Sequence, residues 1–205
     1  IIFRVTPVAI GTRDVLSHVP SAMEWQEINE LSEKQGLTGI SFHGRQRLYK
    51  EYSEQTVYLL IGLKMQWLGM EAYIQEENLL VDERCEETTR MLAEDSFRSC
   101  ILKEQANACY YPQPKLRTSG NIDIWGRPIA SKGLFEDRKL VTKYLINRED
   151  DYIRMQYHHI DYHIFPDGEV DFCPIVLFNY RKNERLQNKF GSGMDGNKNR
   201  NKFDQ

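Results

Sequence analysis

The sequence has few cysteines, and none of them form the close pairs that mark zinc cages or disulfide frameworks. Four cysteines are spread over 205 residues without a Cys-x-x-Cys spacing. Their wide spacing argues against a cysteine-bound zinc site and is typical of a protein from the reducing cytoplasm. We therefore expect ordinary buried thiols at the four positions, which are Cys85, Cys100, Cys109 and Cys173.

Long apolar runs and an excess of one charge are also missing. No stretch approaches the roughly 18 apolar residues that a membrane-spanning helix needs, so we expect no membrane segment. Lysine and arginine number 27 and aspartate and glutamate number 30, a net charge of -3 that does not favour non-specific nucleic-acid binding. The first residues, Ile1–Arg4, lack a signal-peptide layout and an initiator methionine, so we expect the chain to begin inside a longer one.

The first part of the chain, residues 1–95, is predicted to be a helical scaffold. Apolar residues recur at steps of three and four between about Glu54 and Ala93, which predicts one long helix with a buried stripe. The densest part of that stripe is Leu60, Leu63, Trp67, Met70 and Ile74.

An earlier helix is predicted from its end signals. Ser21 and Glu24 have the spacing of a capping box, in which each side chain binds the other residue's backbone amide. The helix is expected over Trp25–Gln35, with Gly36 as its C-terminal stop. The apolar segment Leu37–Phe42 fits either a further helical turn or a strand.

After Asp95 the spacing of apolar residues changes from helical to alternating. Strands are expected at 97–102, 119–125, 157–165 and 169–172, and helices at 106–111 and 136–147. Residues 103–105 and 126–134 are expected to be loops, and Pro166–Gly168 is expected to be the turn of a hairpin.

The stretch Ser119–Trp125 has a pattern of polar residues that predicts a metal site. Asn121 and Asp123 alternate with Ile122 and Ile124, so on a strand the polar pair shares one face and the isoleucines enter the core on the other. Paired oxygen ligands of this kind are typical of a metal site. An edge strand with a solvated polar face is the alternative.

The later hairpin offers further candidate ligands. Glu169 and Asp171 share a face of the second strand. His158 and His159 are adjacent, so they point to opposite faces and cannot easily bind one ion. We interpret them as structural or substrate-contacting residues, while noting that His159 and Asp161 share a face.

Several blocks of the sequence resemble a known family. They are Cys100–Gln105, Tyr110–Pro114, Arg117–Trp125, Tyr157–Asp161 and Glu169–Asp171. In order, spacing and residue type they resemble the bacterial nucleotidyltransferase-like proteins of the DNA polymerase beta superfamily, in particular an uncharacterised group with a helical N-terminal region. The resemblance covers roughly residues 10–190 and is sharpest over residues 100–125.

The resemblance implies an α+β fold with three parts. Residues 1–95 are expected to form the helical region, and residues 96–190 a nucleotidyltransferase-like domain with a small mixed sheet and helices on one face. Residues 191–205 are expected to be a flexible or truncated tail.

The resemblance also implies a magnesium (or manganese) site. In that superfamily two carboxylates on one strand and a third on a neighbouring strand hold two magnesium ions. On this chain Asn121 and Asp123 match the pair, and Asp171 matches the third position, with Glu169 as a second candidate for it. Asp123 and Asp171 are the expected catalytic residues.

The implied substrate is a nucleoside triphosphate. Lys103–Gln105 matches the position of the phosphate-cradling loop, so Lys103 and Gln105 are expected to contact substrate, together with Arg117 and Gly120. An ordinary ion pair is the alternative for Arg117. The acceptor of the nucleotidyl group is left open between a small molecule, a protein and an RNA, and no membrane partner is expected.

Two departures from the family pattern favour an alternative function. Asn121 stands where the family has an aspartate, and an amide oxygen brings no charge to a metal. Glu104 stands where the phosphate loop usually has glycine, and its carboxylate would repel a triphosphate. The alternative is a catalytically inactive nucleotide-binding or protein-interaction module on the same fold.

Overall fold

The computed structural model describes residues 2–51, 61–131, 133–148, 153–156, 159–166 and 168–172. The chain forms two compact units, each built from separate pieces. The helical unit comprises Ile1–Glu83 and Glu104–Gly120, and the sheet unit comprises Arg84–Lys103 and Asn121–Gln205. The two units are defined by which parts of the chain contact one another. The predicted boundary after residue 95 instead marks the change from helices to strands, and it stays a prediction.

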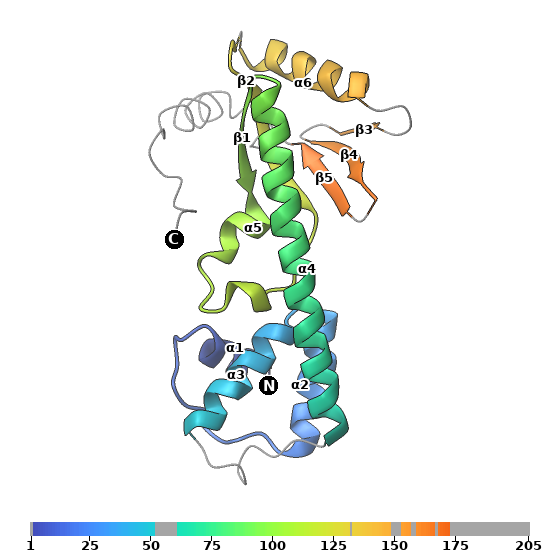
Figure 1. Ribbon diagram of the computed structural model, residues 1–205. Coiled ribbons are helices and arrows are strands. Elements are labelled where there is room, and N and C mark those ends of the chain that lie inside the picture. The colour runs from blue at the N-terminus through green and yellow to red at the C-terminus, as the bar shows by residue number, and fades with distance from the viewer. Residues whose placement is uncertain are drawn as a thin grey trace. The chain divides into compact units, whose positions relative to one another are not determined.

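Helices come first along the chain, and the strands follow with further helices between them (Figure 1). The helices are α1 (Ile2–Ala9), α2 (Ala22–Lys34), α3 (Thr38–Glu51), α4 (Ile61–Glu94), α5 (Lys103–Ala108), the 3-10 helix η1 (Pro114–Leu116) and α6 (Leu134–Arg148). The strands are β1 (Phe97–Leu102), β2 (Ile122–Pro128), β3 (Ile153–Met155), β4 (Ile160–Phe165) and β5 (Gly168–Phe172). The predicted α+β class, with a helical N-terminal region and a small mixed sheet, is confirmed.

Helix α2 has the predicted end signals. The Glu24 amide donates to Ser21 Oγ at 3.3 Å, and the Ser21 amide donates to the Glu24 carboxylate at 2.8 Å. The backbone hydrogen bond from Ser21, followed by the bond from His18, lowers the pKa of Glu24 to about 2. Gly36 ends the helix with a φ of 64°, in the left-handed region where glycine carries no Cβ penalty.

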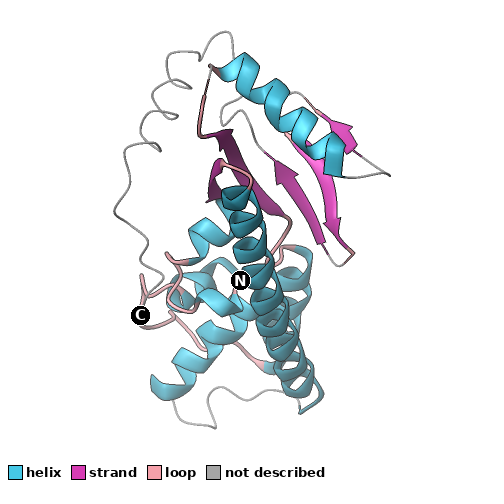
Figure 2. Ribbon diagram, turned by 45° about the horizontal axis from the view of Figure 1, so that its top comes forward, coloured by secondary structure: helices cyan, strands magenta, loops and turns pink. Residues whose placement is uncertain are grey.

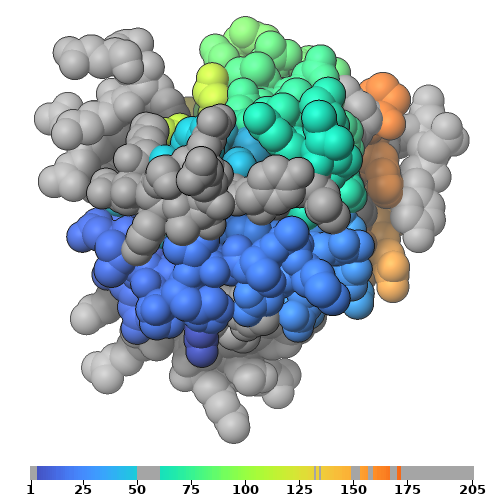
Figure 3. All heavy atoms as spheres, turned by 90° about the horizontal axis from the view of Figure 1, so that it is seen from below, coloured from blue at the N-terminus to red at the C-terminus, as the bar shows by residue number. Residues whose placement is uncertain are grey.

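The core of the helical unit is apolar and aromatic. Trp67 of α4 packs edge-on against Trp25 of α2 and Phe42 of α3, with ring centroids 5.9 and 5.5 Å away. Its indole Nε1 donates to the Asn29 side chain, which satisfies the buried polar atom. Residues of α1 and α2 and the start of α4 gather on one face in the space-filling view (Figure 3).

The ambiguous segment Leu37–Phe42 runs into α3, which begins at Thr38, so its helical alternative is correct. Helix α3 approaches η1 very closely. A Cβ at Gly39 would lie 2.2 Å from the Leu116 carbonyl oxygen, so only glycine fits there. This contact, together with Asn78 of α4, positions the segment that precedes β2.

The sheet has five strands in the order β1-β2-β5-β4-β3 (Figure 2). Strands β2 and β5 pair in parallel, and the other neighbours pair in antiparallel fashion. Strands β4 and β5 form the predicted hairpin. Helix α6 packs against β2, burying Val141 and Leu145. Because β5 is inserted next to β2, residues that are far apart in the sequence become neighbours in the sheet.

Some predicted boundaries are wrong. Strand β2 begins at Ile122 and extends to Pro128, so Asn121 precedes it and part of the expected loop is strand. Residues 103–105 are the first turn of α5, not a loop, because Lys103 adopts a φ of 46° and turns the chain directly from β1 into the helix. That helix ends at Ala108, before the predicted end at Tyr111. Strand β3 was not predicted.

The expectation of four buried thiols is also wrong in part. Cys85 is buried, whereas Cys100 and Cys109 are exposed. Cys100 is an exposed position of β1, which is the edge strand among the strands that the structure describes. Cys173, Tyr157, His158 and the tail 191–205 lie outside the described residues. In the part of the chain that the structure describes, no helix has both the length and the hydropathy needed to cross a membrane.

Candidate metal and nucleotide site

Three aspartates form a row across the central strands of the sheet. Asp123 on β2 is the paired residue of Asp171 on β5, and Asp171 is in turn the paired residue of Asp161 on β4. Paired residues on neighbouring strands project to the same face, and neighbouring strands lie about 4.8 Å apart. The predicted convergence of Asp123 and Asp171 is therefore present, and Asp161 extends it.

Asp123 is an internal, buried residue. Its residue exposure is 2%, and the flanking Ile122 and Ile124 are buried as predicted. The alternative of a solvated edge strand is wrong, because β2 lies between β1 and β5 and is covered on both faces. Lys103 places its Nζ 2.6 Å from Asp123 Oδ1. The positive φ of Lys103 at the junction of β1 and α5 aims its side chain at this strand.

Asp171 is held by the residue just before β2. The Asn121 side-chain amide donates to Asp171 Oδ2 at 2.6 Å. Asn121 therefore lies beside the predicted third carboxylate, even though it precedes the strand. Its contact with Asp171 is made by the nitrogen of the amide, whereas a metal ligand would use the oxygen. Strand β5 contains Glu169, but the side chain of Glu169 lies outside the described ones, so its metal role stays a prediction.

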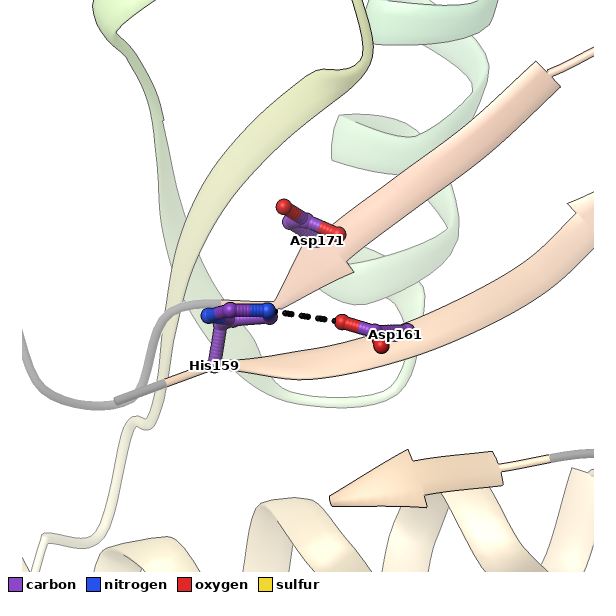
Figure 4. Close-up of side chains that lie close together, drawn as sticks. All are labelled: His159, Asp161 and Asp171. Carbon is purple, nitrogen blue, oxygen red and sulfur yellow. Dashed lines mark ion pairs between the residues drawn. The ribbon is translucent and has the colours of Figure 1, made fainter. Parts of the chain in front are cut away.

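Asp161 brings His159 into the row. His159 Nε2 lies 2.8 Å from Asp161 Oδ1, and the two side chains point toward one another with Asp171 close beside them (Figure 4). Gln156 donates to Asp161 Oδ2 at 3.3 Å, and Arg154 Nε lies 4.0 Å from the same oxygen. The two-residue spacing of His159 and Asp161 was visible in the sequence. Their position opposite Asp171 was not, because it depends on the register of β4 and β5.

The other predicted substrate residues lie in the helical unit. Arg117 forms an ion pair with Glu104, which is the alternative that the sequence left open for it. Burial lowers the pKa of Arg117. The side chain of Asn78 donates to the Arg117 carbonyl at 2.6 Å and fixes the backbone there. Glu104 is thus a structural partner of an arginine, and its carboxylate charge is offset inside its own unit.

Gln105 and Gly120 are placed in the same unit. Gln105 Nε2 donates to Asp82 of α4 at 2.7 Å. A Cβ at Gly120 would meet the Glu104 carboxyl carbon at 3.7 Å, an ordinary contact distance. The structure gives each unit separately, so the substrate roles of Gln105, Gly120 and Arg117 stay predictions.

The donor set on the sheet suits a hard divalent cation. Two or three carboxylates and one side-chain amide are the oxygen ligands that magnesium and manganese prefer. Neighbouring carboxylates repel one another, and Lys103 and Arg154 offset charge at the two ends of the row. A cation beside Asp171 would do the same at the centre. Comparisons with protein-family models, with curated proteins and with solved structures found no match.

Proposed function

We propose that this chain binds a nucleoside triphosphate together with magnesium or manganese and transfers a nucleotidyl group. The observation that supports this most is the pairing of Asp123 and Asp171 on adjacent parallel strands. Carboxylates on neighbouring strands are spaced to share divalent ions, which position a triphosphate and neutralise the leaving pyrophosphate.

Two aspartates of the row and two neighbouring residues have different roles in this proposal. Asp123 and Asp171 would hold the metal, and Asn121, which now donates to Asp171, would contribute its amide oxygen. Lys103, which now pairs with Asp123 and whose side chain is 61% exposed, would contact the triphosphate. In the transfer, the oxygen of an acceptor hydroxyl would bond to the α-phosphorus, the bond from that phosphorus to pyrophosphate would break, and the hydroxyl proton would pass to water, while the metal would supply positive charge. The acceptor is a small molecule, a protein or an RNA, and the widely spaced cysteines support a cytoplasmic setting.

A second function is favoured by two short contacts. Lys103 lies 2.6 Å from Asp123, and Asn121 lies 2.6 Å from Asp171. Donors from the chain itself therefore already bind the two carboxylates that would hold metal. This arrangement supports a catalytically inactive module that keeps the fold and binds a nucleotide or a protein without chemistry.

Calorimetry of the whole chain with ATP, with and without magnesium, tests the proposal. We expect magnesium-dependent binding that is lost in Asp123→Asn and in Asp171→Asn. Asp14→Asn is the matched control, because the Asp14 side chain is 85% exposed. ATP binding that is unaffected by magnesium and by both substitutions would favour the inactive module. Release of pyrophosphate in the presence of an acceptor would separate the enzyme from both non-catalytic outcomes.

A further inference from the structure

A second group of side chains that could bind a metal ion lies at strands β4 and β5. His159, Asp161 and Asp171 each offer one ligand atom, and all these atoms lie within 4.8 Å of one another (Figure 4). The set differs from the predicted magnesium ligands because it includes an imidazole and does not include Asp123. It therefore suits an ion that accepts a nitrogen ligand as well as oxygen ligands.

The local structure explains why these three side chains meet. His159 and Asp161 are two residues apart on an extended segment and so share a face. Asp161 and Asp171 are directly paired on antiparallel strands. Like charges at directly opposed positions destabilise a sheet, and Asp161 is only 6% exposed, so water cannot fully screen the repulsion. A cation bound between the two carboxylates would turn this repulsion into attraction.

Both carboxylates are also oriented from outside the cluster. Gln156 donates to Asp161 Oδ2, and Asn121 donates to Asp171 Oδ2. His159 approaches the other oxygen of Asp161, so the two oxygens of that carboxylate have different neighbours. Hydrogen bonds to the outer oxygens are the means by which proteins hold metal-ligating carboxylates in place.

We propose that His159, Asp161 and Asp171 bind a first-row transition-metal ion, with Mn²⁺ or Zn²⁺ as the chemical class. One imidazole nitrogen and two carboxylate oxygens suit these ions, whereas magnesium takes oxygen ligands and keeps its waters. Ligand atoms about 2.0–2.2 Å from an ion lie at most about 4.4 Å apart, so small side-chain rotations close the set. Three protein ligands leave positions open for water or a substrate oxygen.

This inference goes beyond the proposed function, because the site needs neither a nucleotide nor Asp123. The two proposals share Asp171 but differ at the other residues. His159 belongs only to the transition-metal site, and Asp123 belongs only to the magnesium–nucleotide site. Substitutions at these two positions therefore separate the failure of one proposal from the failure of the other.

Electron paramagnetic resonance of Mn²⁺ is the test, because free Mn²⁺ gives a signal that is lost on binding and manganese avoids the thiols. The whole chain, stripped of metal and without nucleotide, is titrated with MnCl₂. We expect one bound ion per chain, and His159→Leu should weaken its affinity by at least about tenfold. His163→Leu is the matched control, because His163 is an exposed histidine of β4 that does not belong to the cluster, and it should leave the affinity unchanged.

Pulsed measurements on the wild-type chain provide a second test that needs no variant. A coordinated imidazole gives the bound Mn²⁺ a nitrogen coupling, and we expect that coupling here. Bound manganese without nitrogen coupling, or equal affinity in wild type and His159→Leu, would overturn the proposal. Absence of Mn²⁺ binding at millimolar concentration would overturn it as well. Circular dichroism of each variant before titration checks that the fold is retained.

Discussion

The two units of this protein bury different kinds of side chain. The helical unit has an aromatic core around Trp25, Phe42 and Trp67, and its buried polar groups include neutral ones such as Asn29. The sheet unit buries carboxylates, among them Asp123. Apolar burial stabilises a fold, whereas burial of a carboxylate costs free energy unless a cation or donor is supplied. Apolar burial accounts for the stability of the helical core, whereas the buried aspartates need a cation or a hydrogen-bond donor, which is the basis for the metal sites that we propose.

The largest loss of stability is expected in the helical core. Trp67→Ala removes the ring that contacts Trp25 and Phe42, and we expect the free energy of unfolding to fall by about 3–5 kcal/mol. Met65→Ala, on the same helix with the side chain mostly exposed, should change it by less than about 0.5 kcal/mol. Urea denaturation followed by circular dichroism measures both. Similar losses for the two variants would mean that the aromatic cluster does not stabilise this unit.

Removal of the two partners of the Lys103–Asp123 ion pair is expected to have unequal effects on stability. Lys103→Met leaves a buried carboxylate without its ammonium partner and should cost about 1–3 kcal/mol of unfolding free energy. Asp123→Asn leaves an exposed ammonium in water and should cost less than about 1 kcal/mol. Magnesium should reduce the deficit of Lys103→Met, because a bound cation replaces the lost charge. A deficit that magnesium does not change would argue against cation binding at Asp123.

Glu104 is expected to stabilise the fold by pairing with Arg117, and its charge is not expected to repel a bound phosphate. Glu104→Gly removes the partner of the largely buried Arg117 and places glycine in α5, so we expect a loss of about 1–3 kcal/mol. The double variant Glu104→Gly with Arg117→Leu should recover part of this loss, because removing both charges costs less than removing one. Denaturation of the three proteins gives the comparison. Stronger ATP binding by Glu104→Gly at unchanged stability would restore the phosphate-loop interpretation.

A substitution at Asn121 tests whether charge beside Asp171 controls metal affinity. Asn121→Asp replaces a donor to Asp171 with a second carboxylate, so the metal-free protein should be destabilised by roughly 1 kcal/mol. The added charge should strengthen magnesium binding by about tenfold, or about 1.4 kcal/mol. Calorimetry with magnesium and with Mg–ATP tests this. Equal magnesium affinity in wild type and variant would remove Asn121 from the site.

The smallest effect is expected at the cap of α2. The folded-state pKa of Glu24 lies at about 2, below its ordinary value of 4.5, so the charged form is favoured in the folded state. Its contribution is therefore fully present above pH about 4.5 and is lost as the pH falls toward 2. The stability difference between wild type and Glu24→Gln should shrink across that window. Thermal melts at several pH values measure it, and a constant difference would contradict the assignment.

Signals that act over a few residues predicted this fold well. The capping box of α2, strand β1 and helix α6 were predicted because their patterns lie within the elements themselves. The turn at Lys103 was missed because a lysine with positive φ has no pattern in the sequence. The full row was missed because Asp161 joins it only through the order and register of the strands. The pairing of Asp123 with Asp171 was reached through family resemblance.

The insertion of β5 beside β2 also has a consequence for folding kinetics. Asn121 and Asp171 are 50 residues apart in the chain, whereas Asp161 and Asp171 belong to one hairpin. Local pairings form before those that close long loops. In refolding, we therefore expect the hairpin to bring two carboxylates together before β2 arrives with Asn121 and Asp123. If the aspartates bind a divalent ion as we propose, that ion would shield the nascent hairpin, and we then expect metal to raise the refolding rate as well as the final stability.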